Sequence, residues 1–245
     1  MGYWLVVAIA AIAVLTVLIA VATEPETPEI PKRERGARPV WLAMGTSGNP
    51  PGNAGESVPP GWVDHIEDVL GPAVIPYDFT RAGCTAEEAQ REELAAAVAI
   101  APDIVSILLG PDDFRDAEDL GSFERRLWHI LTSLRDAGCI PVLASLPDLT
   151  SLPSLAEEDR EALAEELRSW NAAIARLTAA AGGEFVGCPT DPAGDLFTEE
   201  GSRYILTTAG HRWFASLMGP AVQRLLGIVD EAASHPSSET EGERE

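Results

Sequence analysis

The sequence has few basic residues. Lysine and arginine together number 17, against 39 aspartates and glutamates, so the 245-residue chain has a formal net charge of -22 at pH 7. Proteins that bind the phosphate backbone of nucleic acids need clustered lysine and arginine. The composition therefore excludes nucleic acid as a partner and indicates a well-solvated surface.

Cysteine is also scarce. Cys84, Cys139 and Cys188 are odd in number, and the predicted strands place Cys139 at the opposite end of the sheet from the other two. A disulfide requires Cα atoms within about 7 Å, so we predict three free, mostly buried thiols. No spacing typical of metal ligands occurs. We predict no metal and no cofactor, and the sequence sets no oligomeric state.

The first 22 residues differ from the rest of the chain. Every residue from 3 to 22 is apolar except Thr16. A helix of this length crosses the roughly 30 Å hydrocarbon core of a bilayer, which predicts a membrane anchor in residues 1–22. Ala20-Val21-Ala22 has the form of a signal-peptidase site, so cleavage near Ala22 is the alternative.

Two signals disagree on which side of the membrane the rest of the chain lies. The nearest basic residues follow the apolar run, which favours a cytoplasmic domain, whereas the cleavage-site pattern favours export. We predict a single-pass anchor in the cell membrane with an extracytoplasmic domain, or a secreted form. Residues 23–38 form a proline-containing charged linker, residues 39–230 one domain, and residues 231–245 a disordered acidic tail.

Within the domain, short apolar runs alternate with amphipathic helical segments. Five runs have the apolar or β-branched composition of buried strands: residues 40–44, 73–77, 104–109, 140–146 and 184–187. Residues 85–88 (Thr-Ala-Glu-Glu) and 154–157 (Ser-Leu-Ala-Glu) have the form of capping boxes that open helices, and Gly138 and Gly182 stand where helices should end. This pattern predicts a three-layer α/β/α sandwich around a mostly parallel five-stranded sheet.

A glycine-containing segment follows each of the first three predicted strands. These segments are residues 45–48 (Gly-Thr-Ser-Gly), 81–84 (Arg-Ala-Gly-Cys) and 110–113 (Gly-Pro-Asp-Asp). In an open parallel sheet, the carboxyl ends of the strands beside the topological switch point form the active surface. We therefore expect all three segments at one site.

In order and spacing, these segments resemble the SGNH, or GDSL-like, hydrolase family over about residues 40–226. The family's Gly-Asp-Ser block matches residues 45–47, its second-block glycine matches Gly83, its Gly-x-Asn-Asp block matches residues 110–113, and its Asp-x-x-His block falls on residues 202–205. The resemblance implies the flavodoxin-like SGNH fold and hydrolysis of an ester, such as an acyl group on a glycan or lipid.

The resemblance also implies a role for each matching residue. Ser47 would be the nucleophile, and the N–H groups of Ser47 and Gly83 would belong to the oxyanion hole. The third donor, an asparagine in the family, is here Asp112. An ionised carboxylate ~4 Å from the oxyanion would oppose the reaction by about 4 kcal/mol. Either Asp112 is protonated and donates, or the acids 112 and 113 are solvated or cap the next helix.

The catalytic acid and base are both replaced. Ser202 stands at the position of the acid and Ile205 at that of the base. Shifting the alignment by two residues restores an acid, Glu200, but places Arg203 at the base position. His211 lies six residues beyond Ile205 and, on a continuous helix, would face elsewhere; the other histidines are predicted in helices or the tail.

Two functions remain open from the sequence. One is an esterase in which Ser47 is activated in an irregular way, and the other is a non-catalytic domain that binds a ligand or partner through the same cleft.

Overall fold

The computed structural model describes residues 38–49, 59–116, 118–151, 156–189, 196–200 and 203–228. The predicted anchor, nearly all of the linker, the acidic tail and Ser202 lie outside these residues. Among the helices of the described ranges, none has the length and apolar character needed to cross a membrane.

The centre of the fold is a five-stranded sheet in the order β2-β1-β3-β4-β5, and all neighbouring strands are parallel. The strands are β1 (Val40–Gly45), β2 (Ile75–Asp78), β3 (Ile104–Leu108), β4 (Ile140–Ala144) and β5 (Glu184–Val186). All five predicted strands are confirmed, and so is the α/β class. Because the chain passes from β1 outward to β2 and then back to β3, the topological switch point lies between β1 and β3.

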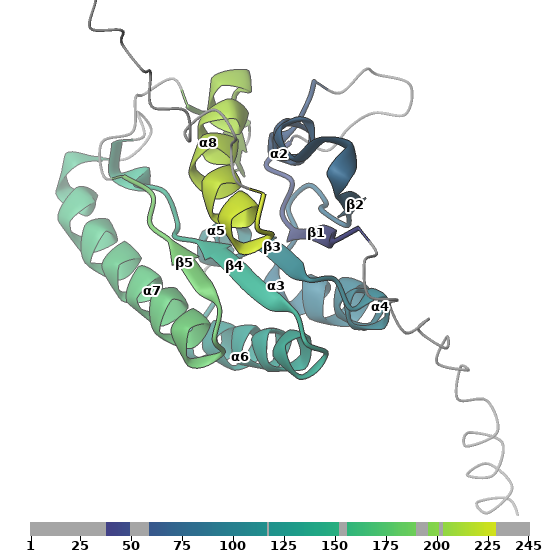
Figure 1. Ribbon diagram of the computed structural model, residues 1–245. Coiled ribbons are helices and arrows are strands. Elements are labelled where there is room, and N and C mark those ends of the chain that lie inside the picture. The colour runs from purple at the N-terminus through teal and green to yellow at the C-terminus, as the bar shows by residue number, and fades with distance from the viewer. Residues whose placement is uncertain are drawn as a thin grey trace, which may run out of the picture. The chain divides into compact units, whose positions relative to one another are not determined.

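Helices cover both faces of this sheet (Figure 1). One face carries α2 (Trp62–Leu70) and α8 (Thr208–Leu225), and the other carries α4 (Leu94–Ile100), α6 (Leu120–Asp136) and α7 (Arg160–Ala180). The shorter elements are α3 (Ala86–Glu88), a π-helical turn (Ala89–Glu93), α5 (Pro111–Arg115), 3-10 turns at Gly71–Ala73, Leu149–Ser151 and Glu157–Asp159, and the antiparallel hairpin of β6 (Phe197–Glu200) and β7 (Arg203–Leu206).

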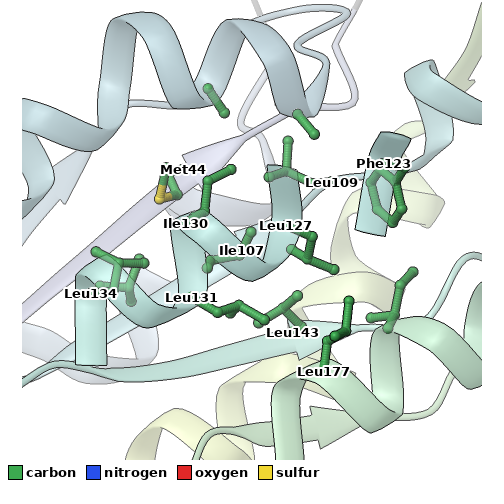
Figure 2. Packing of buried hydrophobic residues seen from close by; sticks show 14 of the residues in the cluster. Met44, Ile107, Leu109, Phe123, Leu127, Ile130, Leu131, Leu134, Leu143 and Leu177 are labelled. Atoms are coloured by element: carbon green, nitrogen blue, oxygen red, sulfur yellow. The ribbon is translucent and has the colours of Figure 1, made fainter. Parts of the chain in front are cut away.

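Side chains of the central strands alternate between two cores. In β1, Leu42 and Met44 pack toward α6, whereas Trp41 and Ala43 pack toward α2 and α8. Figure 2 shows the first core, where leucines and Ile130 of α6 meet the apolar side chains of β1, β3 and β4. Both faces of β1 and β3 are therefore buried, which explains why these strands are apolar without a polar alternation.

The predicted helix ends are largely confirmed. The Thr85 side chain accepts a hydrogen bond from the N–H of Glu88, and the Glu88 carboxylate accepts one from the N–H of Thr85. These two bonds form a capping box. Gly138 and Gly182 follow α6 and α7 with φ of +87° and +75°, the left-handed conformation expected after a helix.

Two expectations from the sequence are wrong in detail. The five strands are not all buried on both faces, because β2 and β5 are the edge strands and their residues are partly exposed. The helix expected to open at residues 154–157 begins later, at Arg160 after a 3-10 turn, and Ser154 itself lies outside the described residues.

Candidate functional site

The site begins where β1 ends at the switch point. Gly45 has a φ of +95°, and a Cβ atom placed on it would lie 2.2 Å from the carbonyl oxygen of Leu108. The next N–H, of Thr46, donates to that same oxygen at 2.8 Å. Glycine is required here because the backbones of β1 and β3 approach closely.

Ser47 follows with both of its polar groups engaged. Its hydroxyl oxygen accepts a hydrogen bond from the N–H of Asn49 at 3.2 Å, and its own N–H donates to the carbonyl oxygen of Arg81 at 2.9 Å. An oxyanion hole needs an N–H that points at the reacting oxygen. In this conformation the Ser47 N–H is used inside the fold, which differs from its expected role.

A buried carboxylate holds the segments that carry Ser47 and Gly83. Glu93, 4% exposed, lies in the π-helical turn and accepts hydrogen bonds from the N–H of Gly45 (2.9 Å), from Nε of Arg81 (3.0 Å) and from the thiol of Cys84 (3.2 Å). The main chain of Arg81 also forms hydrogen bonds on both sides of Thr46. Its N–H donates to the carbonyl oxygen of Gly45, and its carbonyl oxygen accepts from the N–H of Ser47. Glu93 therefore fixes the spacing between the first and second segments.

Gly83 lies in the second segment with a φ of +71°, and Cys84 follows it. Burial raises the pKa of the Cys84 thiol, and the Glu93 carboxylate beside it raises the pKa further. All three cysteines are free, as predicted. Cys84 is thus a thiol that donates a hydrogen bond within the fold and has little nucleophilic character.

The two acids of the third segment are buried and have separate partners. Asp112 forms an ion pair with Arg115, one turn further along α5. Asp113 accepts hydrogen bonds from the N–H of Ala86 (2.8 Å) and of Gly110 (3.1 Å). Burial raises the pKa of Asp113 to about 6, although these two N–H groups act in the opposite direction.

The prediction that the acids 112 and 113 are solvated is wrong. They are not solvated, since Asp112 is 7% and Asp113 1% exposed. Asp113 is a helix-capping acid, which links the third segment to the start of α3. Asp112 lies at the position of the family's amide donor and is paired with Arg115.

Of the residues that match the family's last block, Ser202 lies outside the described residues, and Ile205 lies in β7 and is 6% exposed. The following residue, Leu206, donates its N–H to the carbonyl oxygen of Gly48 at 2.9 Å. The hairpin is therefore bonded directly to the segment that carries Ser47.

His211 lies beside this segment, and the expectation that it faces elsewhere is wrong. That expectation assumed one helix from Ile205 to His211, but Ile205 belongs to a strand and α8 begins only at Thr208. The imidazole is 2% exposed, and its Cε1 atom lies 3.5 Å from where a Cβ of Gly48 would be. The position of His211 could not be predicted from its distance in sequence to Ile205, because the turn before α8 changes the direction of the chain.

The hydrogen bond of His211 sets which ring nitrogen carries the proton. Nδ1 accepts from the backbone N–H of Trp62 at 3.2 Å, so the neutral ring has its proton on Nε2. A histidine that activates a serine needs the opposite arrangement, with Nδ1–H held by an acceptor and the lone pair on Nε2. Burial lowers the pKa of His211 to about 4; His65 contributes in the same direction and Asp64 opposes.

A small cavity of about 30 Å³ opens at this edge of the sheet. Its lining is mostly apolar, with two polar side chains among twelve residues: Thr46, Gly48, Leu108, Pro111, Asp112, Pro147, Leu149, Cys188, Phe197, Leu206, Trp213 and Phe214. One water molecule needs about 10–15 Å³ on this measure, and a 150 Å³ cavity accepts benzene. The cavity is therefore narrow, and a second pocket of about 200 Å³ shares Pro147 and Cys188 of its lining.

Comparison with known proteins identifies the family. The model of the GDSL-like lipase/acylhydrolase family matches residues 44–213, more than half of the chain. The chain belongs to this family. No protein of curated function matches it.

Among solved structures of GDSL-like and related proteins, two illustrate the shared fold. The esterase EstA of a Pseudoalteromonas species is 15% identical with a TM-score of 0.59, over 77% of this chain and 98% of that one. The acetylxylan esterase Axe2 of Geobacillus stearothermophilus is 16% identical with a TM-score of 0.59, over 80% and 98%. At such identities the likeness establishes the fold alone.

The structure of this GDSL-like domain brings Leu206 and His211 against Gly48, the residue after Ser47, and places Asp112 on the cavity wall. Sequence reasoning missed Glu93 and Arg115. The spacing of Asp112 and Arg115, three residues apart on a helix, was an available signal for their ion pair. Glu93 gave no signal, because its partners are distant in sequence. Across the described ranges, no group of three or more His, Cys, Asp or Glu side chains has an arrangement suited to a metal.

Proposed function

We propose that this protein is a non-hydrolytic member of the GDSL-like family, which binds an acylated glycan or lipid at the carboxyl edge of its sheet. The observation that carries the proposal is the hydrogen bond from the Trp62 N–H to Nδ1 of His211. Nδ1 is occupied and Nε2 carries the proton, so neither nitrogen can accept the proton of the Ser47 hydroxyl.

Two further features support this proposal. The Ser47 N–H donates to the carbonyl oxygen of Arg81 instead of pointing at a substrate oxygen. Asp112, paired with Arg115, replaces an amide donor. Each of these features removes a separate donor to the oxyanion.

The proposal predicts no covalent labelling of Ser47 by a fluorophosphonate probe. The wild-type protein should be indistinguishable from the Ser47→Ala variant in labelling and in hydrolysis of p-nitrophenyl acetate, because a serine without a base is a weak nucleophile. An active esterase labelled in parallel confirms that the probe works. Labelling of wild type that disappears in Ser47→Ala would show that the proposal is wrong.

A second candidate function is ester hydrolysis with Ser47 as nucleophile, which membership of a lipase/acylhydrolase family favours. The fold likeness to an acetylxylan esterase makes acetylated xylan the first substrate to test. Release of acetate by wild type, lost in Ser47→Ala, would support this candidate. In a triple variant, Ser202→Asp, Ile205→His and Asp112→Asn supply the missing groups and test whether the scaffold supports turnover.

We propose further that residues 1–22 anchor the protein in the cell membrane with the domain outside the cytoplasm. The apolar run from residue 3 to residue 22 supports this proposal. The chain should stay in the membrane fraction after alkaline carbonate extraction and should be digested by protease added to intact cells. A soluble product whose N-terminus follows Ala22 would indicate a cleaved signal peptide instead.

A further inference from the structure

His211 connects two walls of the site. Its ring packs on Gly48, which lines the cavity, and its Nδ1 accepts the N–H of Trp62 at the first turn of α2. The Trp62 ring contacts Phe214 edge-on, with centroids 5.2 Å apart, and Phe214 also lines the cavity. The start of α8, the start of α2 and the segment after Ser47 are thus held by one buried imidazole.

The bond at Nδ1 can exist only while the ring is neutral. A protonated ring would present an N–H toward the Trp62 N–H, and its positive charge would face the N-terminus of α2, where the helix dipole is also positive. The buried Nε2 of the neighbouring His65 also has no hydrogen-bond partner among the described residues.

The charged groups around His211 do not compensate for its protonation. From α2, Asp64 favours the charged ring and His65 disfavours it, and desolvation outweighs both. The Asp64 carboxylate is already engaged with the N–H of Gly61 at 2.6 Å. On its own helix, His211 precedes the exposed Arg212, and Glu184 of β5 pairs with Arg224 at the far end of α8.

We propose that His211 is an acid-sensitive latch that holds α2 on α8 and thereby keeps the cavity beside Ser47 closed. This inference rests on the proposed binding function, since a ligand bound at this edge must enter the narrow cavity of about 30 Å³. Acidification releases Trp62 from His211, frees Phe214 from its packing and widens the cavity enough for an acyl group to enter.

The direction of the effect follows from proton linkage. His211 has a pKa of about 4 in the closed state and the ordinary value of 6.5 once released. Between these two values the released state binds more protons, so the latch is at full strength above pH 6.5 and weakens as the pH falls toward 4. The two values imply a roughly hundredfold increase in the opening equilibrium between pH 7 and pH 4.

Hydrogen exchange of the full chain in detergent micelles tests the latch, with rates corrected for the intrinsic effect of pH. We expect the protection of α2 to fall by roughly a hundredfold between pH 7 and pH 4, while that of α6 stays within about threefold. In His211→Asn, the amide oxygen accepts the Trp62 N–H and does not titrate, so α2 should remain protected at pH 4. The matched control His129→Asn, on α6, should behave as wild type.

Either of two results would overturn the latch: acid opening of α2 that persists unchanged in His211→Asn, or simultaneous loss of protection in α2 and α6, which is global unfolding. If His211→Asn does not fold at pH 7, imidazole NMR of wild type decides, and a pKa near 6.5 for His211 rejects the proposal. Fluorophosphonate labelling of the same samples separates the two proposals, because labelling of Ser47 contradicts the non-hydrolytic function and leaves the latch untouched.

Discussion

Replacing Gly45 by alanine is expected to destabilise the domain by roughly 2–5 kcal/mol, enough to leave much of it unfolded. Two costs combine. An alanine at a φ of +95° is strained, and its Cβ would lie 2.2 Å from the Leu108 carbonyl oxygen, which is main chain and cannot rotate away. Separating β1 from β3 would break the bond from Thr46 to that oxygen. Urea denaturation followed by tryptophan fluorescence measures the loss.

Gly138→Ala is the matched control for this substitution. Gly138 has a similar φ of +87°, but nothing lies within 4 Å of the position of its Cβ. Only the backbone strain remains in this variant, so we expect the free energy of unfolding to fall by about 1–2 kcal/mol. The difference between the two variants isolates the close approach of the two strands. Equal losses would mean that β1 and β3 can separate at the switch point without cost.

Replacing Glu93 by alanine is expected to destabilise the domain by about 3 kcal/mol and to lower its melting temperature by roughly 6–12 °C. The substitution leaves the buried N–H of Gly45 without an acceptor and takes the partner from Nε of Arg81. Arg81 is 40% exposed and recovers part of its solvation from water, so the loss stays below that of a fully buried ion pair.

Glu92→Ala is the matched control, because Glu92 also pairs with Arg81 but is 43% exposed. We expect no measurable change in the free energy of unfolding, since exposed ion pairs contribute little. Glu93→Gln keeps one acceptor oxygen and should fall between the two variants. If Glu93→Ala and Glu92→Ala are equally stable, Glu93 does not hold the segments together. The effects of Gly45→Ala and Glu93→Ala should not add, because the two residues share a hydrogen bond.

The fold was predictable because its determinants are local. The apolar runs at residues 40–44 and 104–109 gave the two central strands, and the capping box at Thr85 gave the start of α3. The site was predictable only as far as the three strand-end segments, since a parallel sheet places them together whatever their side chains.

The state of the site was not predictable in the same way. His211 was placed wrongly because the chain changes from strand to helix at Thr207, between Ile205 and His211. The acids 112 and 113 are adjacent in sequence but have different partners: Asp113 accepts from the N–H groups of Ala86 and Gly110, and Asp112 pairs with Arg115. A one-residue step on a helix turns the side chain by about 100°, which is enough to separate the two roles.

The sequence by itself determined the α/β/α architecture and the strand-end segments, because periodicity and capping are properties of neighbouring residues. The tertiary structure alone decided how Ser47 is surrounded. The Glu93 carboxylate meets Gly45 across 48 residues, and the Trp62 N–H meets His211 across 149. Hydrogen bonds over such separations depend on how the helices pack on the sheet, and they determine which donors and lone pairs remain for chemistry.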